Sequence, residues 1–388
     1  MPYNPGDGGT PQYNLTYASL PLTLQGKGIT SIVSHDRDPA MDLADVHDDI
    51  ARIGSTGISD PADWGWFQEG YDKEPTDSPT APPGGTHDTY VTHHNGPQYF
   101  GYLSNNLKEQ THFHGMGDFF NAIKRAKLSS NGGVYYLKGG YENIFGLKPT
   151  DPDPAAQANF LGDDDHPGYS DAQMSEANVA LAIDAIAESP YWSNSAIVIT
   201  WDDSEGYYDH VPPQLRVNLP GIGYTSDRPR VPLIVISPFA KTRTISHEDG
   251  DQASVVKLVD QIFGLEPLAA VPDELRARQE GLQKYDVSSL GPFDGDTTGI
   301  GTLLSAFDPQ RLEGTKPPLP ASYVYVPTSD ILQLPAQSGI GCSTLGIVPT
   351  DVQLGLRDTP PSDFNPRPGT DPPEGAARRR PESRAIDD

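Results

Sequence analysis

The chain has 388 residues and carries 53 acidic against 27 basic side chains, which gives a formal net charge of −26 at pH 7. Nucleic acids and anionic membranes both bind basic surfaces, so this charge argues against either partner. The single cysteine, Cys342, excludes an internal disulfide framework and a cysteine-based metal cluster. No apolar run approaches the roughly 18 residues of a membrane-spanning helix, so we expect no stable membrane insertion.

The first hundred residues alternate short apolar segments with loops rich in glycine and proline. Residues 1–27 are loop-like, residues 28–34 predict a strand, and residues 42–53 predict a helix from apolar residues at helical spacing. Residues 59–71 predict a second strand and turn. We expect the aromatic side chains of this strand to pack in a core rather than to take part in chemistry: Trp64, Trp66 and Phe67.

Two pairs of histidines follow. His93 and His94 lie in a loop that enters an aromatic segment, and adjacent histidines without further spacing are by themselves a weak metal signal. His112 and His114 form the second pair, which we expect to consist of surface or packing residues.

The middle of the chain predicts a helix at 116–128, a strand at 133–138 and a long helix at about 172–188. An acidic loop at 149–165 precedes the long helix and ends in three consecutive aspartates. These could bind a surface cation, but a solvated run of charge is the favoured interpretation. His166 follows directly, just before a helix N-terminus, where anions are favoured. The predicted core face of the helix is Val179, Ile183 and Ile186.

The most informative stretch is 196–213. It opens with a run of β-branched residues typical of a strand buried on both faces of a parallel sheet. The run ends in Asp202 and Asp203, and Asp209 and His210 follow. Because ligands of open α/β sheets bind where strands end, two adjacent carboxylates there favour a metal-assisted hydrolytic site. An acidic loop that merely caps a strand is the alternative.

A further strand is predicted at 230–238 and an amphipathic helix at 254–264, ended by Gly264. Strands and helices therefore alternate from 28 to 264, which predicts an α/β fold with a mainly parallel sheet covered by helices. Residues 270–355 are rich in loops and are expected to wrap the core. The sequence predicts three parts: an α/β domain at 1–300, a loop-rich extension at 301–358 and a disordered tail at 359–388.

The sequences of several segments resemble those of the phosphoesterase family of bacterial phospholipases C and secreted acid phosphatases, within the alkaline-phosphatase-like superfamily. The matching segments are 189–192, 196–203 and 208–213, the His-His pair ahead of Tyr99-Phe100, and the His-Pro-Gly-Tyr segment from His166. The resemblance implies a three-layer α/β/α architecture and a divalent metal ion held by Asp202 and Asp203. It also implies imidazoles that contact phosphate or move the leaving group's proton, and we assign that role to His93, His94, His166 and His210.

Two features of the family lack a match. Relatives begin with a buried strand that ends in a Glu-Asn metal pair, followed by a Ser or Thr nucleophile. Glu142-Asn143 has the two residue types of the metal pair but does not follow the first strand. No Ser or Thr near the start of the chain has the sequence context expected of the nucleophile; the candidates are Ser19, Ser31, Ser34, Ser55 and Thr56. Two aspartates alone are too few ligands for tight binding of a divalent ion. The simplest hypothesis is an amino-terminally truncated copy without its first strands and export signal, since the resemblance suggests a secreted or periplasmic protein.

The leading functional prediction is a metal-assisted hydrolase of small-molecule or lipid phosphate esters, of acid phosphatase or phospholipase C type. Attack on phosphorus by a Ser or Thr held at a metal is what the resemblance implies. This functional prediction requires that four side chains converge on one pocket: Asp202, Asp203, His94 and His166. The alternatives are a catalytically incomplete homologue, a cation-binding protein without activity, and the same fold acting on sulfate esters or phosphonates.

Overall fold

A computed structural model describes residues 19–25, 62–72, 89–100, 103, 109–143, 145–204, 209, 211, 215–219, 223–226, 229–270, 279, 282–283 and 300–334. The predicted strand at 28–34, the helix at 42–53 and the tail at 359–388 lie outside these residues. The chain divides into two compact units, which are described separately. The first holds the described residues of 1–199, 234–277 and 291–336, and the second those of 200–233 and 278–290.

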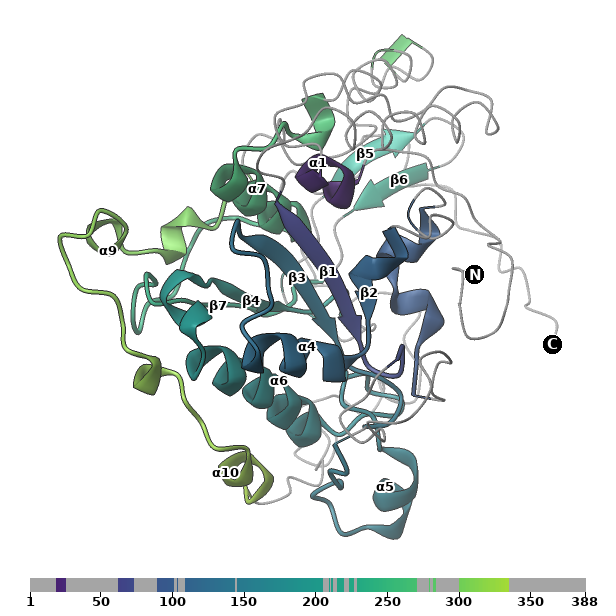
Figure 1. Cartoon of the computed structure of the whole chain (residues 1–388). Helices are drawn as coiled ribbons and strands as arrows, with labels where there is room; N and C mark the ends of the chain where they lie inside the picture. Colours follow the sequence, from purple (N-terminus) through teal and green to yellow (C-terminus); the bar gives the residue numbers. More distant parts are fainter. Residues whose placement is uncertain are drawn as a thin grey trace. The chain divides into compact units, whose positions relative to one another are not determined.

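A three-stranded parallel sheet lies at the centre of the first unit, in the order β2-β1-β3 (Figure 1). β1 (Asp63–Gln68) pairs in parallel with β3 (Gly133–Lys138) along its whole length and with the short β2 (Phe113–His114) on its other side. β1 and β3 lie where the sequence predicts strands. β2 was not predicted, because two residues are too few to show an alternating pattern.

Side chains of β1 contribute to a different core on each face of this sheet. Trp64 packs with leucines of α1 (Leu20–Gln25) and with Val259 of α7 (Gln252–Phe263). Phe67 points to the opposite face and packs with Phe119 of α4 (Met116–Lys124) and Ala182 of α6 (Ala172–Ala187). The prediction that the aromatic residues of β1 are packing residues is confirmed, and the first unit is mixed α/β with a small parallel sheet.

The prediction for the core face of α6 is confirmed only in part, because Ile186 packs against the cluster that contains Phe67 and Phe119. Val179, Ile183 and Ile186 are half-buried, whereas the fully covered positions are mostly small: Met174, Ser175, Ala177, Asn178, Ala180, Ala182 and Ala187. Small side chains let neighbouring elements approach the helix from two sides. Ala182 packs in the cluster that contains α4, and Ala177 and Ala180 pack with Ile331 of α10 (Thr328–Leu332). A search for large apolar residues at helical spacing misses a helix buried in this way.

The strand at 197–200, which the sequence predicts to be buried on both faces, is only half-covered. β4 (Ile197–Thr200) and β7 (Leu233–Ile236) form where the sequence predicts them and pair with each other. The side chains of Leu233 and Ile234 are nevertheless 40% and 47% exposed, and those of Ile197, Val198 and Ile199 are half-buried. The prediction of burial on both faces is therefore wrong, because an apolar run predicts a strand but not the number of layers that cover it.

α7 confirms the helix predicted at 254–264. It begins at a capping box formed by Asp251 and Ser254 and ends at Gly264, whose φ of +64° is in the left-handed region that favours glycine. β5 (Leu215–Leu219) and β6 (Gly223–Ser226) form an antiparallel pair in a segment predicted as loop.

The remaining elements are short: α5 (Pro154–Asn159), α9 (Pro309–Leu312) and 3-10 helices at Thr92–His94, Gly96–Tyr99, Glu109–His112, Pro190–Asn194, Leu268–Ala270, Leu304–Ala306 and Ala321–Tyr323. Among the described residues, no helix is both long enough and apolar enough to span a membrane.

Candidate functional site

The carboxyl ends of β1 and β3 hold the loop that carries His93 and His94. The Gln68 side chain, on the last residue of β1, donates a hydrogen bond to the carbonyl of Val91 at 2.7 Å. Beyond β3, the amide of Tyr141 donates to the carbonyl of Thr89 at 3.0 Å. Both contacts flank the two histidines, so the loop is tied to the edge of a parallel sheet at which ligands commonly bind.

A second loop, which carries Asp163 to His166, packs directly against the end of β3. The Gly140 amide donates to the Asp163 carboxylate at 3.1 Å, and the Asp163 amide donates back to the Gly140 carbonyl at 3.3 Å. A Cβ atom at Gly139 would lie 2.7 Å from the Asp163 carbonyl, and one at Gly162 would lie 2.8 Å from the Gly140 carbonyl. These backbones approach so closely that only glycine fits at both places.

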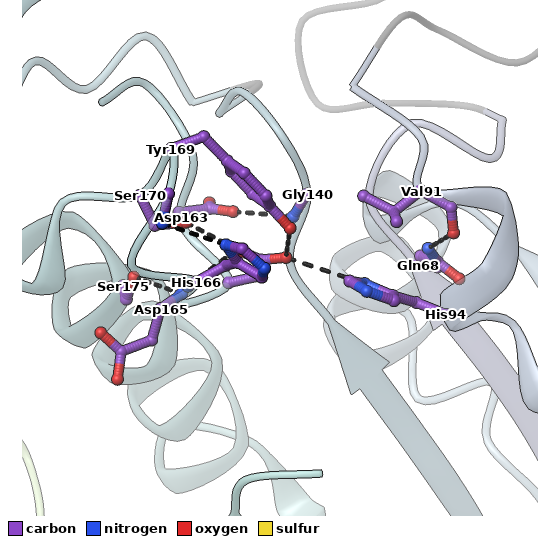
Figure 2. A network of polar contacts seen from close by, with 12 residues as sticks. Gln68, Val91, His94, Gly140, Asp163, Asp165, His166, Tyr169, Ser170 and Ser175 are labelled. Atoms are coloured by element: carbon purple, nitrogen blue, oxygen red, sulfur yellow. Dashed lines mark hydrogen bonds and ion pairs between the residues drawn. The ribbon is translucent and has the colours of Figure 1, made fainter. Parts of the chain in front are cut away.

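Asp164 joins the two loops, and Figure 2 labels the residues around it, which include His94, His166 and Tyr169. Its side chain is fully buried and accepts three hydrogen bonds: from the Tyr169 hydroxyl at 2.8 Å, the Ser170 hydroxyl at 2.6 Å and the His166 amide at 3.2 Å. Its Oδ2 atom also lies 3.7 Å from Nδ1 of His94, within ion-pair distance. The structure thus places His94 next to the loop that carries His166, and the convergence of the predicted site residues on one pocket stays a prediction.

The His166 ring is held in place by its own loop. It stacks on the Tyr169 ring, with centroids 4.3 Å apart and an angle of 10° between the planes. Its Nδ1 atom accepts a hydrogen bond from the Gly168 amide at 3.1 Å, so the proton of the neutral ring is on Nε2. His93 is exposed, and its ring contacts that of His94 edge to face at 4.4 Å.

Two of the three aspartates before His166 are not solvated, contrary to the prediction, and the third, Asp165, is half-buried. The side chain of Asp164 is fully buried, and Asp163 is 2% exposed beside Glu69, which is 0% exposed. Burial raises the pKa of Asp163 to about 6, an effect partly offset by the neighbouring Glu69 carboxyl and the Gly140 amide. Asp163 and Asp164 are buried because glycines let the backbone of their loop lie against the end of β3. A run of acidic residues in the sequence does not by itself indicate such a contact.

His166 lies just before the N-terminus of α6, as the sequence predicts, but a side chain already caps that terminus. The Asp171 side chain caps α6 and accepts hydrogen bonds from the Gln173 and Met174 amides. These amides are therefore occupied, and Asp164 and Tyr169 set the position of His166 instead.

The second pair of histidines, His112 and His114, consists of packing residues, as predicted. His112 stacks on Trp64 at 4.4 Å and donates through Nδ1 to the Trp64 carbonyl at 2.6 Å. His114 stacks on Phe67 at 4.8 Å, and its Nδ1 lies 3.3 Å from the Asp118 carboxylate. The Asn143 amide is likewise structural, because it donates to the carbonyls of Leu147 and Leu161.

Asp202 and Asp203 follow β4 after one intervening residue, Trp201, and belong to the second unit. Asp202 is exposed and Asp203 half-buried, and their convergence with His94 and His166 stays a prediction. His210 lies outside the described residues. Asp209 pairs with Arg230, whose guanidinium donates to both carboxylate oxygens at 2.8 and 2.9 Å and holds the pKa of Asp209 well below its usual range.

The described residues do not by themselves fit a divalent metal ion. Within these ranges, no group of three or more His, Cys, Asp or Glu side chains is arranged to hold one. Asp202 and Asp203 supply hard oxygen ligands of the type that such ions prefer, but two carboxylates form an incomplete set.

Sequence reasoning missed three residues of this site: Glu69, Asp164 and Tyr169. For Asp164 and Tyr169 the sequence offered a local signal, because both lie within a few positions of His166 and Gly162 precedes all three. Burial of the acids was needed to separate this group from an ordinary charged loop.

Comparisons with known proteins identify the family of this chain. A profile described as the phosphoesterase family matches residues 45–266, more than half of the chain, and this range contains His94, Asp164 and His166. The chain is 31% identical over 124 residues to non-specific phospholipase C1 of Arabidopsis thaliana. The matched segment covers 27% of this chain and 23% of that protein. It is 28% identical over 127 residues to the non-hemolytic phospholipase C of Pseudomonas aeruginosa, covering 26% of this chain and 18% of that protein.

A third relative is the non-hemolytic phospholipase C of Burkholderia pseudomallei. It is 24% identical over 184 residues, which cover 42% of this chain and 24% of that protein. The matched parts thus span less than a quarter of these relatives. The length and position of the profile match show that this chain is a member of the phosphoesterase family.

Proposed function

We propose that this chain hydrolyses phosphoric esters, with the phosphate bound beside His94 and His166 at the carboxyl ends of β1 and β3. The supporting observation is that one buried carboxylate, Asp164, lies within ion-pair distance of the His94 imidazole and accepts a hydrogen bond from the backbone amide of His166, in a chain of the phosphoesterase family. The relatives above are phospholipases C by name, so we propose a phospholipid or another phosphodiester as substrate rather than a monoester.

The chemistry of the two imidazoles suits such a substrate. Hydrolysis adds water across the ester bond: an oxygen attacks phosphorus, the P–O bond to the alcohol breaks, and the leaving alkoxide takes up a proton. An imidazolium can supply that proton, and imidazole N–H groups can donate hydrogen bonds to the phosphate oxygens as charge develops. His93, exposed beside His94, is a candidate for a further contact with phosphate.

The proposal keeps Asp202 and Asp203 as candidate ligands of a divalent metal ion and His210 as a candidate catalytic residue. A metal ion bound there would supply Lewis-acid stabilisation of phosphate charge. We also propose that the small parallel sheet belongs to a larger three-layer α/β/α architecture of alkaline-phosphatase type, since members of one family share a fold.

The test is an assay on an aryl phosphodiester, the matching monoester and the matching sulfate ester, each with and without added divalent cation. We expect the diester to be the preferred substrate, and His94→Gln and His166→Gln each to lower kcat/KM by about 100-fold. His114→Gln is the matched control, since His114 packs on Phe67 away from the network, and it should change kcat/KM by less than about threefold.

Each contrary result has a definite meaning. Turnover of the sulfate ester alone would replace the proposed substrate class. Absence of turnover on all three esters, at every metal concentration, would contradict the proposal and favour a catalytically incomplete homologue. Equal activity of His94→Gln and the wild type would remove His94 from the site.

A further inference from the structure

We propose that Asn131 is a site of spontaneous chemical modification, at which the side-chain amide is lost and isoaspartate forms in the main chain before Gly132. The inference goes beyond the proposed function and does not depend on it. It starts from a dipeptide that occurs twice in this chain, as Asn95-Gly96 and as Asn131-Gly132.

The reaction at Asn131 needs water and hydroxide but no enzyme. Hydroxide removes the proton of the Gly132 amide, and the nitrogen attacks Cγ of Asn131, so that a new C–N bond closes a succinimide ring. The bond from Cγ to Nδ2 breaks, and the amide group takes a proton from water and leaves as ammonia. Water then opens the ring: addition at Cγ gives aspartate, and addition at the main-chain carbonyl gives isoaspartate. A glycine after the asparagine has no side chain to hinder the attacking nitrogen.

The turn that enters β3 exposes Asn131 to this reaction. Asn131 is exposed, and within the part of the chain that the structure describes no residue forms a hydrogen bond with its side chain. The Gly132 amide donates to the Ser129 carbonyl at 3.3 Å, a long hydrogen bond that is easily broken. The two reacting atoms therefore lie in a surface turn, where local opening costs little free energy.

The fold requires glycine at position 132. The φ of Gly132 is +83°, in the region that favours glycine, and a Cβ atom there would lie 3.1 Å from the ring of Phe263 at the end of α7. Any residue that could slow the reaction through its side chain would therefore strain this turn. The reactive dipeptide is thus a consequence of the turn geometry.

Asn95-Gly96 is a matched control within the same chain. Asn95 is 0% exposed, and its side-chain amide donates to the Tyr90 hydroxyl at 3.1 Å. Its main-chain amide donates to the Thr92 carbonyl at 3.4 Å, and its carbonyl accepts from the Gln98 amide at 3.2 Å. Because both its side chain and its main chain are held away from water, we expect Asn95 to stay intact in the folded protein.

Isoaspartate at 131 would affect the pairing of β1 with β3. The Gly132 carbonyl accepts a hydrogen bond from the Asp63 amide at 3.1 Å, beside the first pair of the parallel register, Asp63 with Gly133. Isoaspartate adds a methylene group to the main chain, which moves this carbonyl. The contact lies at the amino end of the sheet, away from the loops of the candidate site, so we expect a loss of stability.

The first experiment follows both dipeptides in the folded protein. The protein is incubated at mildly alkaline pH in 18O-labelled water, and peptide mass spectrometry with fragmentation distinguishes aspartate from isoaspartate. We expect Asn131 to lose its amide at least about tenfold faster than Asn95, with uptake of labelled oxygen. In urea the two rates should agree within about threefold, because the fold no longer protects Asn95. Asn131→Gln should give no product at 131, since its side chain would have to close a larger ring.

The second experiment measures the effect on the sheet. The isoaspartate form is separated by ion exchange, because it carries an additional carboxylate. Its melting temperature should be lower than that of the unreacted protein by about 2 °C or more. Asn131→Asp adds the same charge to an unaltered main chain and should melt within about 1 °C of the wild type.

Contrary results are defined for both experiments. An Asn131 that keeps its amide in the folded protein, or an Asn95 that reacts as fast there, would overturn the inference. Isoaspartate at 131 with an unchanged melting temperature would overturn the effect on the sheet. None of these measurements uses ester hydrolysis, so a failure of the proposed function is recognised separately.

Discussion

The carboxylate of Asp164 lies 3.7 Å from Nδ1 of His94, although the two residues come from different loops of the chain. One loop is bonded to the carboxyl ends of β1 and β3, and the other is packed against the end of β3 through glycines. The meeting of these side chains is therefore a product of the sheet, and the following predictions test the groups that maintain it.

The hydroxyl of Tyr169 stabilises the buried Asp164. Tyr169→Phe keeps the ring that stacks on His166 but removes the hydrogen bond to the carboxylate. We expect the free energy of unfolding to fall by about 1–3 kcal/mol, because a buried charged group loses a donor. Urea denaturation measures this change. Tyr141→Phe, a tyrosine in edge contact with Tyr169, is the control and should cost under about 0.5 kcal/mol. Equal losses in both variants would mean that the hydroxyl bond contributes nothing.

The stability of the protein should depend on pH through Asp163. Burial raises its pKa from 3.8 to about 6, so between these values the folded state keeps a proton that the unfolded state has lost. The free energy of unfolding therefore decreases as pH rises through this window, by an amount on the order of 2 kcal/mol. Asp163→Asn, which stays neutral, should lack this decrease.

Urea denaturation of the wild type and of Asp163→Asn between pH 4 and pH 7 measures the effect. The two proteins should have similar stability near pH 4, and the variant should be the more stable at pH 7. Parallel pH profiles would show that Asp163 has its usual pKa in the folded protein.

Gly140 allows the loops to approach β3. A Cβ atom there would lie 2.6 Å from the Thr89 carbonyl, a contact that backbone atoms relieve only by moving. We expect Gly140→Ala to lower the free energy of unfolding by about 1–3 kcal/mol and to reduce ester hydrolysis, since both loops of the site shift. Gly96→Ala, where a Cβ would meet nothing within 4 Å, is the matched control, and thermal unfolding of the two variants gives the comparison. Equal melting temperatures for both variants would contradict the steric argument.

A metal requirement would involve Asp203. If Asp202 and Asp203 bind a divalent ion, a chelator should abolish ester hydrolysis. Asp203→Asn should then raise the metal concentration for half-maximal activity by about tenfold or more, because the ion loses one of few ligands. Asp249→Asn, at an exposed aspartate, is the control for the change in charge. Hydrolysis that resists the chelator and is unaffected in Asp203→Asn would remove the metal from the proposal.

The elements that sequence predicts well are those whose signals are local. β1, β3, α4 and α7 lie where alternation, helical spacing or an end-marking glycine places them. The packing of α6 was mispredicted because its buried positions are mostly alanines, and the coverage of β4 because an apolar run does not report its neighbours.

Taken alone, the sequence determined the family and the mixed α/β character, because both depend on the order of residues along the chain. Only the tertiary structure decided that Asp163 and Asp164 are buried and that Asp164 faces His94. Those facts depend on backbone contacts at Gly139, Gly140 and Gly162 between segments distant in sequence. Such contacts exclude water from Asp163 and Asp164, and no signal in the order of residues along the chain reports a contact of this kind.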